Sequence, residues 1–152
     1  MAQALAERLN TDDPKGKIVQ QSSVGAIITL DDFILARSAN VLPPQLKKNM
    51  VAVCETVKED GRYHLIEHAE RAAIFQGLIS GKNLEGATIY CTRFPCSDCA
   101  RAIVWAGIKR AVFAGGFAGE QRWLESQRAA LKILRDSGIK IRYVSPIKIL
   151  TA

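Results

Sequence analysis

The most regular pattern in the first third of the chain is a pair of apolar runs separated by two acidic residues. The first run, VGAIITL, covers residues 24–30, and the second, FILARS, begins at Phe33. Each run has the length and composition of a strand, and Asp31–Asp32 between them is typical of a turn. The pattern therefore predicts two strands joined as an antiparallel hairpin.

The second half of the chain alternates between helical and strand patterns. Helical spacing begins at His68, with Ala69, Ala72, Ala73, Leu78 and Ile79 as its apolar positions and Gly81 as its stop. The helical pattern returns at residues 97–106 and 120–137, and short apolar runs typical of buried strands occupy residues 87–92, 110–116 and 139–144. Helical crossovers make the strands that they connect parallel. We therefore expect an α/β fold, a three-layer α/β/α sandwich around a mixed sheet of about five strands with the last three parallel.

The remaining segments have weaker patterns. LAERL near the N-terminus is helix-like, and Pro14 and Gly16 interrupt it. Residues 39–46 contain Pro43–Pro44 and are expected to form a loop. Residues 47–61 fit either a helix or irregular structure. No internal repeat is visible, and 152 residues can bury a core of their own, so we expect residues 1–152 to form a single domain.

The amino-acid composition indicates a soluble globular protein but says little about its function. A hydrophobic share of 48% and a charged share of 24% are ordinary for a soluble globular protein. No apolar run approaches the length of a membrane span, and the N-terminus does not resemble a secretory signal, so a cytoplasmic location is expected. The net charge of +6 comes from scattered lysines and arginines. That scatter disfavours nucleic acid as a partner, but a positive field can still attract small anions such as nucleotides.

Two predicted helices begin with residues that bind metals. His68 and Glu70 lie at the start of one, and the segment PCSDC places Cys96 and Cys99 in the first turn of the next. Imidazole and thiolate ligands suit Zn²⁺, and three protein ligands leave a fourth tetrahedral position for water, as in catalytic zinc sites. Glu70 would then stand beside the metal as a proton carrier. One Zn²⁺ per chain is therefore expected.

Other interpretations of these residues stay open. The Cys96–Cys99 pair could be a redox motif, and a closed structural zinc site could recruit a fourth ligand from His64, Cys54 or Cys91. Cys54 and Cys91 lie in apolar surroundings that favour packing as small hydrophobic residues. The alternative to an enzyme is a noncatalytic, zinc-stabilised binding module. Such a module would have no use for a carboxylate that does not bind the metal.

The segments EHAERAAI (67–74) and TIYCTRFPCSDCARAIVWAGIKRAVFAGG (88–116) resemble the cytidine and deoxycytidylate deaminase superfamily. The resemblance implies hydrolytic deamination of a cytosine-containing nucleotide, dCMP or CMP, to dUMP or UMP plus ammonia. In that reaction a zinc-bound hydroxide attacks the ring carbon that bears the amino group, with His68, Cys96 and Cys99 as ligands and Glu70 as the proton shuttle. Related deaminases usually self-associate, so a homo-oligomer, a dimer or higher, is also expected.

The resemblance also indicates residues near the substrate. Asn40, followed by Pro43, matches a family asparagine that contacts the substrate, although asparagine is also common in turns. The backbone at Ala69 would approach the flat base, although alanine is also simply a good helix former. Phe94 stands where the tRNA-adenosine branch usually carries an acidic residue, which favours the deoxycytidylate branch.

The identity of the substrate is the least determined feature. Arg71 and Arg93 flank the expected pocket in sequence, and either could hold a phosphate, although surface ion pairs are the simpler role. Trp123 could stack on a base, but its place in an apolar helical stripe favours packing. Many relatives have asparagine where this chain has Ala72. A free base, a nucleoside or another amino-substituted heterocycle is therefore the alternative substrate, and an RNA deaminase is a weaker one because of Phe94.

Overall fold

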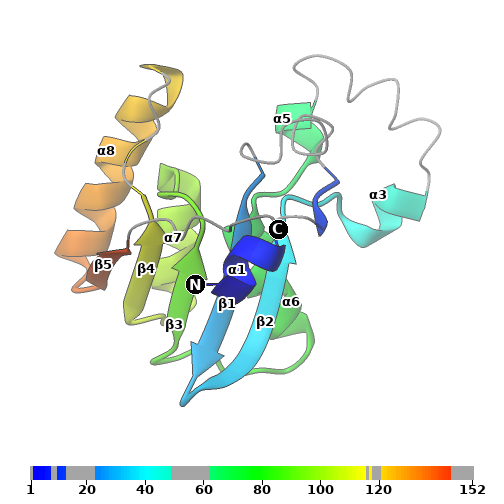
Figure 1. The fold of residues 1–152 in the computed structure, drawn as a ribbon, viewed down its shortest axis with the longest axis horizontal. Coiled ribbons are helices and arrows are strands. Elements are labelled where there is room, and N and C mark those ends of the chain that lie inside the picture. Colours follow the sequence, from blue (N-terminus) through cyan, green and yellow to red (C-terminus); the bar gives the residue numbers. More distant parts are fainter. Residues whose placement is uncertain are drawn as a thin grey trace, which may run out of the picture.

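The computed structural model describes residues 2–7, 10–12, 23–48, 62–115, 117 and 121–144. The described strands form one five-stranded sheet, and helices lie on both of its faces (Figure 1). The strands are β1 (Gly25–Leu30), β2 (Phe33–Ala39), β3 (Thr88–Cys91), β4 (Arg110–Ala114) and β5 (Lys140–Val144). The helices are α1 (Ala2–Glu7), α3 (Pro44–Lys48), α5 (Arg62–Leu65), α6 (Ala69–Ile79), α7 (Ser97–Trp105) and α8 (Gln121–Asp136).

The sheet has the order β2-β1-β3-β4-β5. Strand β1 pairs antiparallel with both β2 and β3, whereas β3, β4 and β5 run parallel. Asp31 and Asp32 have φ values of 47° and 67°, as a tight two-residue hairpin turn of this kind requires. The predicted α/β class, with a mixed five-stranded sheet whose last three strands are parallel, is confirmed.

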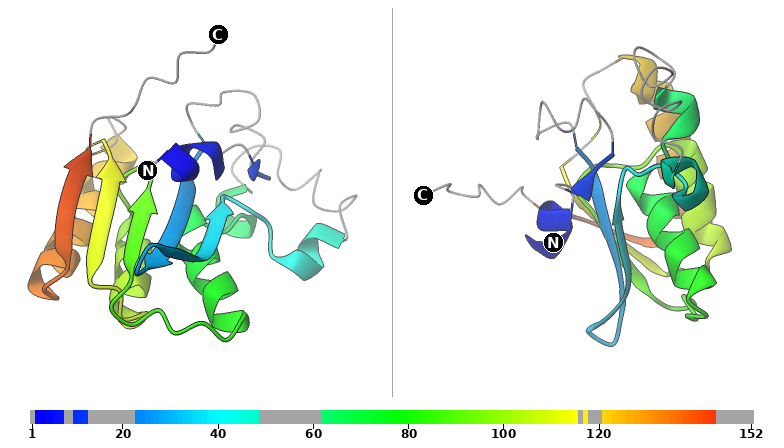
Figure 2. Two further views of the ribbon diagram at one scale, coloured as in Figure 1. Left: turned by 60° about the horizontal axis from the view of Figure 1, so that its bottom comes forward. Right: turned by 90° about the vertical axis from the view of Figure 1, so that its right-hand side faces the viewer.

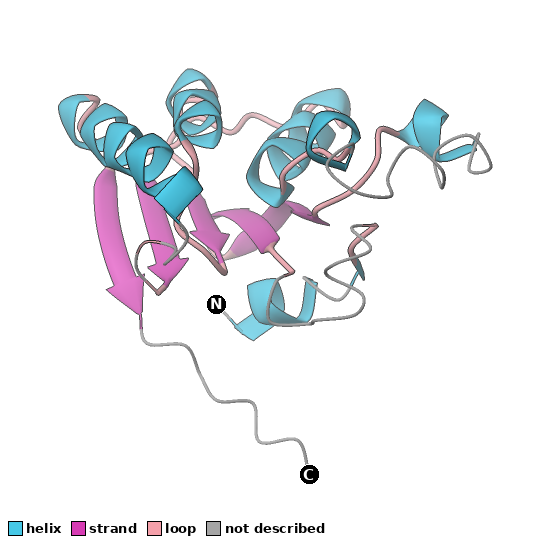
Figure 3. Ribbon diagram, turned by 90° about the horizontal axis from the view of Figure 1, so that it is seen from above, coloured by secondary structure: helices cyan, strands magenta, loops and turns pink. Residues whose placement is uncertain are grey.

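Helices α6, α7 and α8 cover one face of the sheet, and the short α1 lies on the other (Figures 2 and 3). The main core lies between the three long helices and the sheet. Each helix contributes small or branched apolar residues to it, and the sheet contributes larger ones; the fully buried members include Ala73, Ala100, Ile103, Ala130, Leu134, Ile28, Ile89 and Phe113. No helix in the described part of the chain is both long and apolar enough to cross a membrane.

Two local expectations are wrong. Pro44 is not a loop residue but begins the short helix α3, because the first helical position needs no amide donor and suits the fixed φ of proline. Leu78 and Ile79 do not pack inward, since they are 52% and 86% exposed. Helix α6 faces the sheet through Ala69, Ala73 and other residues on its opposite side. Cys54 lies outside the described residues.

Candidate active site

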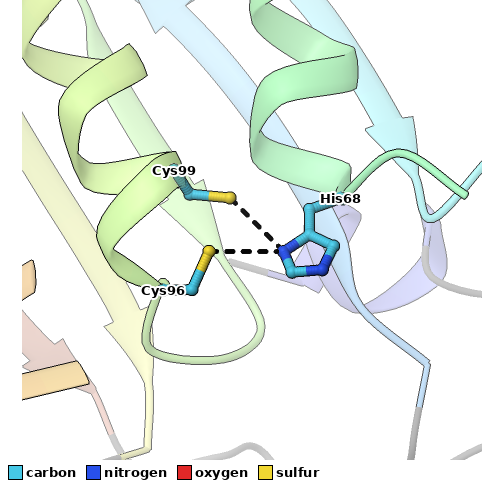
Figure 4. Close-up of side chains that lie close together, drawn as sticks. All are labelled: His68, Cys96 and Cys99. Atoms are coloured by element: carbon cyan, nitrogen blue, oxygen red, sulfur yellow. Dashed lines mark hydrogen bonds between the residues drawn. The ribbon is translucent and has the colours of Figure 1, made fainter. Parts of the chain in front are cut away.

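Helices α6 and α7 both begin near the C-terminal end of the central strand β3. Helix α6 leads down into β3, and α7 leads away from it, so both helices begin at the end where β3 finishes. His68 is the N-cap residue of α6, and Cys96 is the N-cap residue of α7. Neither makes a side-chain capping bond. Their side chains point toward each other instead, together with that of Cys99 (Figure 4).

These three side chains have the spacing of a tetrahedral metal site. The Nδ1 atom of His68 lies 3.5 Å from the Sγ atoms of both Cys96 and Cys99, and the three donor atoms lie within 4.8 Å of one another. Zinc bonds of about 2.3 Å to sulfur and about 2.0–2.1 Å to nitrogen, at tetrahedral angles, separate sulfur from nitrogen by about 3.5 Å. The residues therefore fit one Zn²⁺ without rearrangement.

The electrostatics of the cluster favour a bound cation. The hydrogen bond with Cys99 and the neighbouring His68 lower the pKa of Cys96 to about 4, so its sulfur is a thiolate at neutral pH. The same sulfur–sulfur hydrogen bond, together with burial, raises the pKa of Cys99 well above its ordinary value. The hydrogen bond with Cys96 raises the pKa of His68. A thiolate, a thiol and an imidazole thus converge on a common point, where a divalent ion would displace the protons that remain on the donor atoms.

Glu70 lies in the first turn of α6 and is only 3% exposed. Burial raises the pKa of its carboxyl group, and the charge of His68 acts in the opposite direction. Its charge also acts on Cys99 and on the fully buried Cys91. The carboxylate therefore lies close enough to the cluster to interact with it electrostatically, yet it is not among the three described donors that share one metal position. This is the placement expected of a proton carrier beside a metal.

Asn40 lies at the end of β2, against the start of α6. Its Oδ1 atom accepts a hydrogen bond of 3.0 Å from the backbone N–H of Ala69. Its backbone carbonyl accepts bonds from the Thr11 hydroxyl at 2.9 Å and from the Asp12 amide at 2.8 Å. The structure thus brings Asn40 and Ala69 together beside His68 and fixes the orientation of the asparagine side chain.

Arg71 has its guanidinium group directed at protein carboxylates. Its Nε atom donates to Glu67 at 2.6 Å, a second guanidinium nitrogen pairs with the same oxygen, and Nη1 lies 3.5 Å from Asp98 of α7. Glu67 also accepts the backbone N–H of His68 at 2.9 Å. Arg71 therefore ties α6 to α7 beside the cluster, which disfavours it as a phosphate ligand. Arg93 is exposed on the loop between β3 and α7.

Phe94 is buried away from the solvent. It is 3% exposed, and its ring packs edge-on against Phe113 and Phe117, with interplanar angles of 61° and 66° and centroid distances of 4.8 Å and 4.9 Å. Its ring also stacks on Tyr143 at 6.0 Å. A side chain held in this way has no surface to offer a ligand, so the structure disfavours the predicted substrate contact and gives Phe94 a place in the core.

Helix α8 contributes to the site in a way that the sequence analysis only partly anticipated. Trp123 packs edge-on against His68, with ring centroids 6.1 Å apart, rather than lying only in the core. Ser126 and Gln127, which the sequence analysis missed, bond to the segment that carries Cys96. A signal was present, because Gln127 is a polar residue in line with the apolar positions Trp123, Ala130 and Leu134 of the same helix.

Comparisons with known proteins agree with this geometry. The profile of the family described as "Cytidine and deoxycytidylate deaminase zinc-binding region" matches residues 1–115. Deoxycytidylate deaminase of Enterobacteria phage T2 is 38% identical over 74 residues, which cover 49% of this chain and 36% of that protein. The chain thus spans about a third of the length of that relative.

A longer match and a solved structure extend the comparison. Deoxycytidylate deaminase of Mus musculus is 28% identical over 149 residues, which cover 96% of this chain and 78% of that protein. The apo crystal structure of dCMP deaminase from cyanophage S-TIM5 superposes with a TM-score of 0.67, at 20% identity and with 94% and 92% of the two chains covered. This structural likeness supports the fold, and the family profile covers most of the chain. The chain therefore belongs to the cytidine and deoxycytidylate deaminase family, whose enzymes bind zinc.

Proposed function

We propose that the protein is a zinc-dependent hydrolase that converts a cytosine-containing nucleotide, dCMP or CMP, to dUMP or UMP and ammonia. The observation that carries this proposal is the His68–Cys96–Cys99 donor set with the buried carboxylate of Glu70 close to it. A purely structural zinc site needs no such carboxylate, whose burial without a use would cost stability. The phage and mouse relatives, both deoxycytidylate deaminases, make dCMP the first substrate to test.

In this proposal each residue of the site has a defined task. His68, Cys96 and Cys99 would hold the metal, which when bound would act as a Lewis acid and lower the pKa of a coordinated water from about 16 to about 7. Glu70 takes the proton that the attacking water loses and delivers it to the amino group that departs as ammonia. The backbone at Ala69 supports one side of the base.

Asn40 is the residue that we expect to orient the sugar of the nucleotide. Its Oδ1 atom is engaged by the Ala69 amide, so the geometry of that bond directs the donor side of the amide group away from the helix backbone. The Thr11 hydroxyl and the Asp12 amide bond to the backbone carbonyl of Asn40 and so hold the backbone that carries this side chain. The asparagine is thus oriented before any substrate arrives, which lowers the entropic cost of binding.

Arg93 is the arginine that we propose for a phosphate contact, because its side chain is exposed on the loop that leads to Cys96. The guanidinium group of Arg71 pairs with Glu67 and Asp98, and a phosphate would have to compete with those carboxylates. Arg93 is exposed and lies three residues before Cys96. A guanidinium group in that loop can donate two parallel N–H bonds to a phosphate.

A free base, a nucleoside or another amino-substituted heterocycle is the alternative substrate. The feature that favours it is Ala72, which is buried in α6 at 5% exposure and offers no polar group. An RNA deaminase is less well supported, because the residue before the Pro-Cys pair is the buried Phe94 rather than an acid. Ammonia release from a panel of bases, nucleosides, nucleotides and transfer RNA would separate these substrates.

We further propose that residues 1–152 act as a single domain that associates with a second copy of the chain. The outer surfaces of α6 and α7 expose large apolar side chains: Phe75 at 46%, Leu78 at 52%, Ile79 at 86% and Trp105 at 89%. By contrast, the exposed positions of α8 include Arg128, Lys132, Arg135 and Asp136. Clustered apolar exposure on one pair of helices, beside a charged neighbour, is typical of a protein interface.

A further inference from the structure

The first turn of α7 lacks the usual means of fixing a helix start. Serine, threonine, aspartate or asparagine at the N-cap normally accepts one of the unpaired amide hydrogens. Here the N-cap residue is Cys96, which makes no side-chain capping bond and directs its sulfur at His68. The position of Cys96, and with it that of Cys99 one turn later, must therefore be secured by another part of the chain.

Helix α8 supplies the missing partner. The backbone N–H of Ser97, the first residue of α7, donates to the Oγ atom of Ser126 at 3.0 Å. The two serine hydroxyls also lie 3.1 Å apart, within hydrogen-bonding distance. Ser126 thus caps α7 from a helix that begins 24 residues later in the sequence than α7 itself.

A second contact from α8 fixes the chain just before Cys96. The Nε2 atom of Gln127 donates to the backbone carbonyl of Phe94 at 3.1 Å. The side chains of Gln127 and Phe94 are 5% and 3% exposed, and Pro95, which lies between Phe94 and Cys96 in the sequence, is fully buried. A buried carbonyl that loses its partner is costly, so this bond opposes any movement of the Phe94–Pro95 segment.

Trp123 lies on the same face of α8 and contacts His68, the donor on the opposite side of the cluster from Cys96. Residues 123, 126 and 127 are spaced three and four positions apart, so their side chains share one side of the helix. Trp123 reaches the ring of His68, while Ser126 and Gln127 reach the segment with Cys96. One helix therefore contacts both of the segments that carry zinc donors.

We propose that α8 is the positioning helix of the zinc site, with Ser126 and Gln127 as the residues that hold Cys96 and Cys99 at ligating distance from His68. The two bonds fix the backbone on either side of Cys96. Groups that orient metal-binding residues typically contribute about 10- to 100-fold to metal affinity. This role concerns the zinc site, and it is independent of which substrate the proposed deaminase accepts.

The test is the zinc affinity of the zinc-loaded protein, measured by competition with a chelator. We expect Ser126→Ala and Gln127→Met each to weaken zinc binding by about 10- to 100-fold. Ser126→Thr keeps a hydroxyl group at this position and should restore affinity. Matched controls are Gln121→Met at the exposed first residue of α8 and Ser137→Ala at the exposed residue that follows α8; both should bind zinc like the wild type.

A role in packing alone would give a different result. It would lower the melting temperature of the chelated, zinc-free variants while leaving zinc affinity within about 2-fold of the wild type, and that outcome would overturn the proposal. The visible spectrum of the Co²⁺-substituted protein provides a second measurement, because it reports the geometry of the thiolate ligands. An unchanged spectrum in both variants would also contradict it. A wild-type protein that binds zinc but deaminates nothing would refute the proposed function and leave this inference intact.

Discussion

Replacement of Glu70 by glutamine tests the proposed chemistry with little disturbance of the structure. The side chain is 3% exposed in the first turn of α6 and interacts electrostatically with His68 and Cys96 without being one of the three donors. Glutamine has nearly the same shape as glutamate, but its amide group does not take up and release a proton near neutral pH. The three zinc donors are unaltered, so we expect the variant to retain one zinc per chain.

The expected loss of turnover follows from the task assigned to the carboxylate. General acid–base catalysis contributes about 10²–10⁴-fold, which corresponds to about 2.7–5.5 kcal/mol of transition-state stabilisation. We therefore expect kcat for dCMP to fall by at least about 10²-fold, with a smaller change in KM. Burial raises the pKa of Glu70, so its ionised form destabilises the zinc-free fold at neutral pH. The glutamine variant, once stripped of zinc, should melt no lower than the wild type.

The assay is ammonia release from dCMP, combined with elemental analysis of zinc in the same preparation. Glu85→Gln is the matched control, because it makes the same change at a side chain that is 61% exposed and forms a surface ion pair with Lys109. The control should keep wild-type turnover. If the zinc-replete Glu70→Gln protein turned over dCMP at close to the wild-type rate, the assigned role of Glu70 would be wrong.

Four further predictions follow from the structure. Cys96→Ser should purify with much less than one zinc per chain by elemental analysis, and full retention would remove Cys96 from the donor set. Phe94→Ala should lower the free energy of unfolding by about 3–5 kcal/mol, against about 0.5 kcal/mol or less for Phe33→Ala at a 75% exposed position; equal losses would contradict the buried placement. Arg93→Ala should shrink the preference for dCMP over deoxycytidine by about 10- to 150-fold and spare the nucleoside reaction, whereas an unchanged ratio would exclude this phosphate contact. Trp105→Glu should reduce the mass measured by light scattering toward that of one chain, and a wild-type protein that is already a single chain would refute the proposed association.

Local sequence patterns predict the elements of this fold well. The hairpin is specified by two apolar runs and by Asp31–Asp32, whose side chains tolerate the positive φ that the turn requires. The parallel arrangement of β3, β4 and β5 follows from the intervening helices α7 and α8. By contrast, periodicity contains no information on which strand the hairpin joins, and the antiparallel pairing of β1 with β3 had to come from the structure.

The candidate site divides in the same way. The donors His68, Cys96 and Cys99 could be predicted from sequence because each lies at the start of a helix, within a short recognisable motif. The surroundings of each side chain depend on segments that are distant in sequence, so local sequence patterns do not predict them. Phe94 is buried because strands β4 and β5 bring Phe113 and Tyr143 beside it. The hydrogen bonds of Ser126 and Gln127 span 29 and 33 residues, beyond the reach of any local pattern.

The most direct test of the proposed function is the fate of dCMP incubated with the zinc-loaded protein in water enriched in ¹⁸O. If the protein is a hydrolytic nucleotide deaminase, each dUMP formed should be matched by one ammonia, and mass spectrometry should find one heavy oxygen in the product, as the carbonyl oxygen on the ring carbon that carried the amino group. Removal of zinc by a chelator should abolish both products, and its return should restore them. A zinc-loaded protein that releases no ammonia from dCMP, CMP or any other compound of the panel would contradict the account.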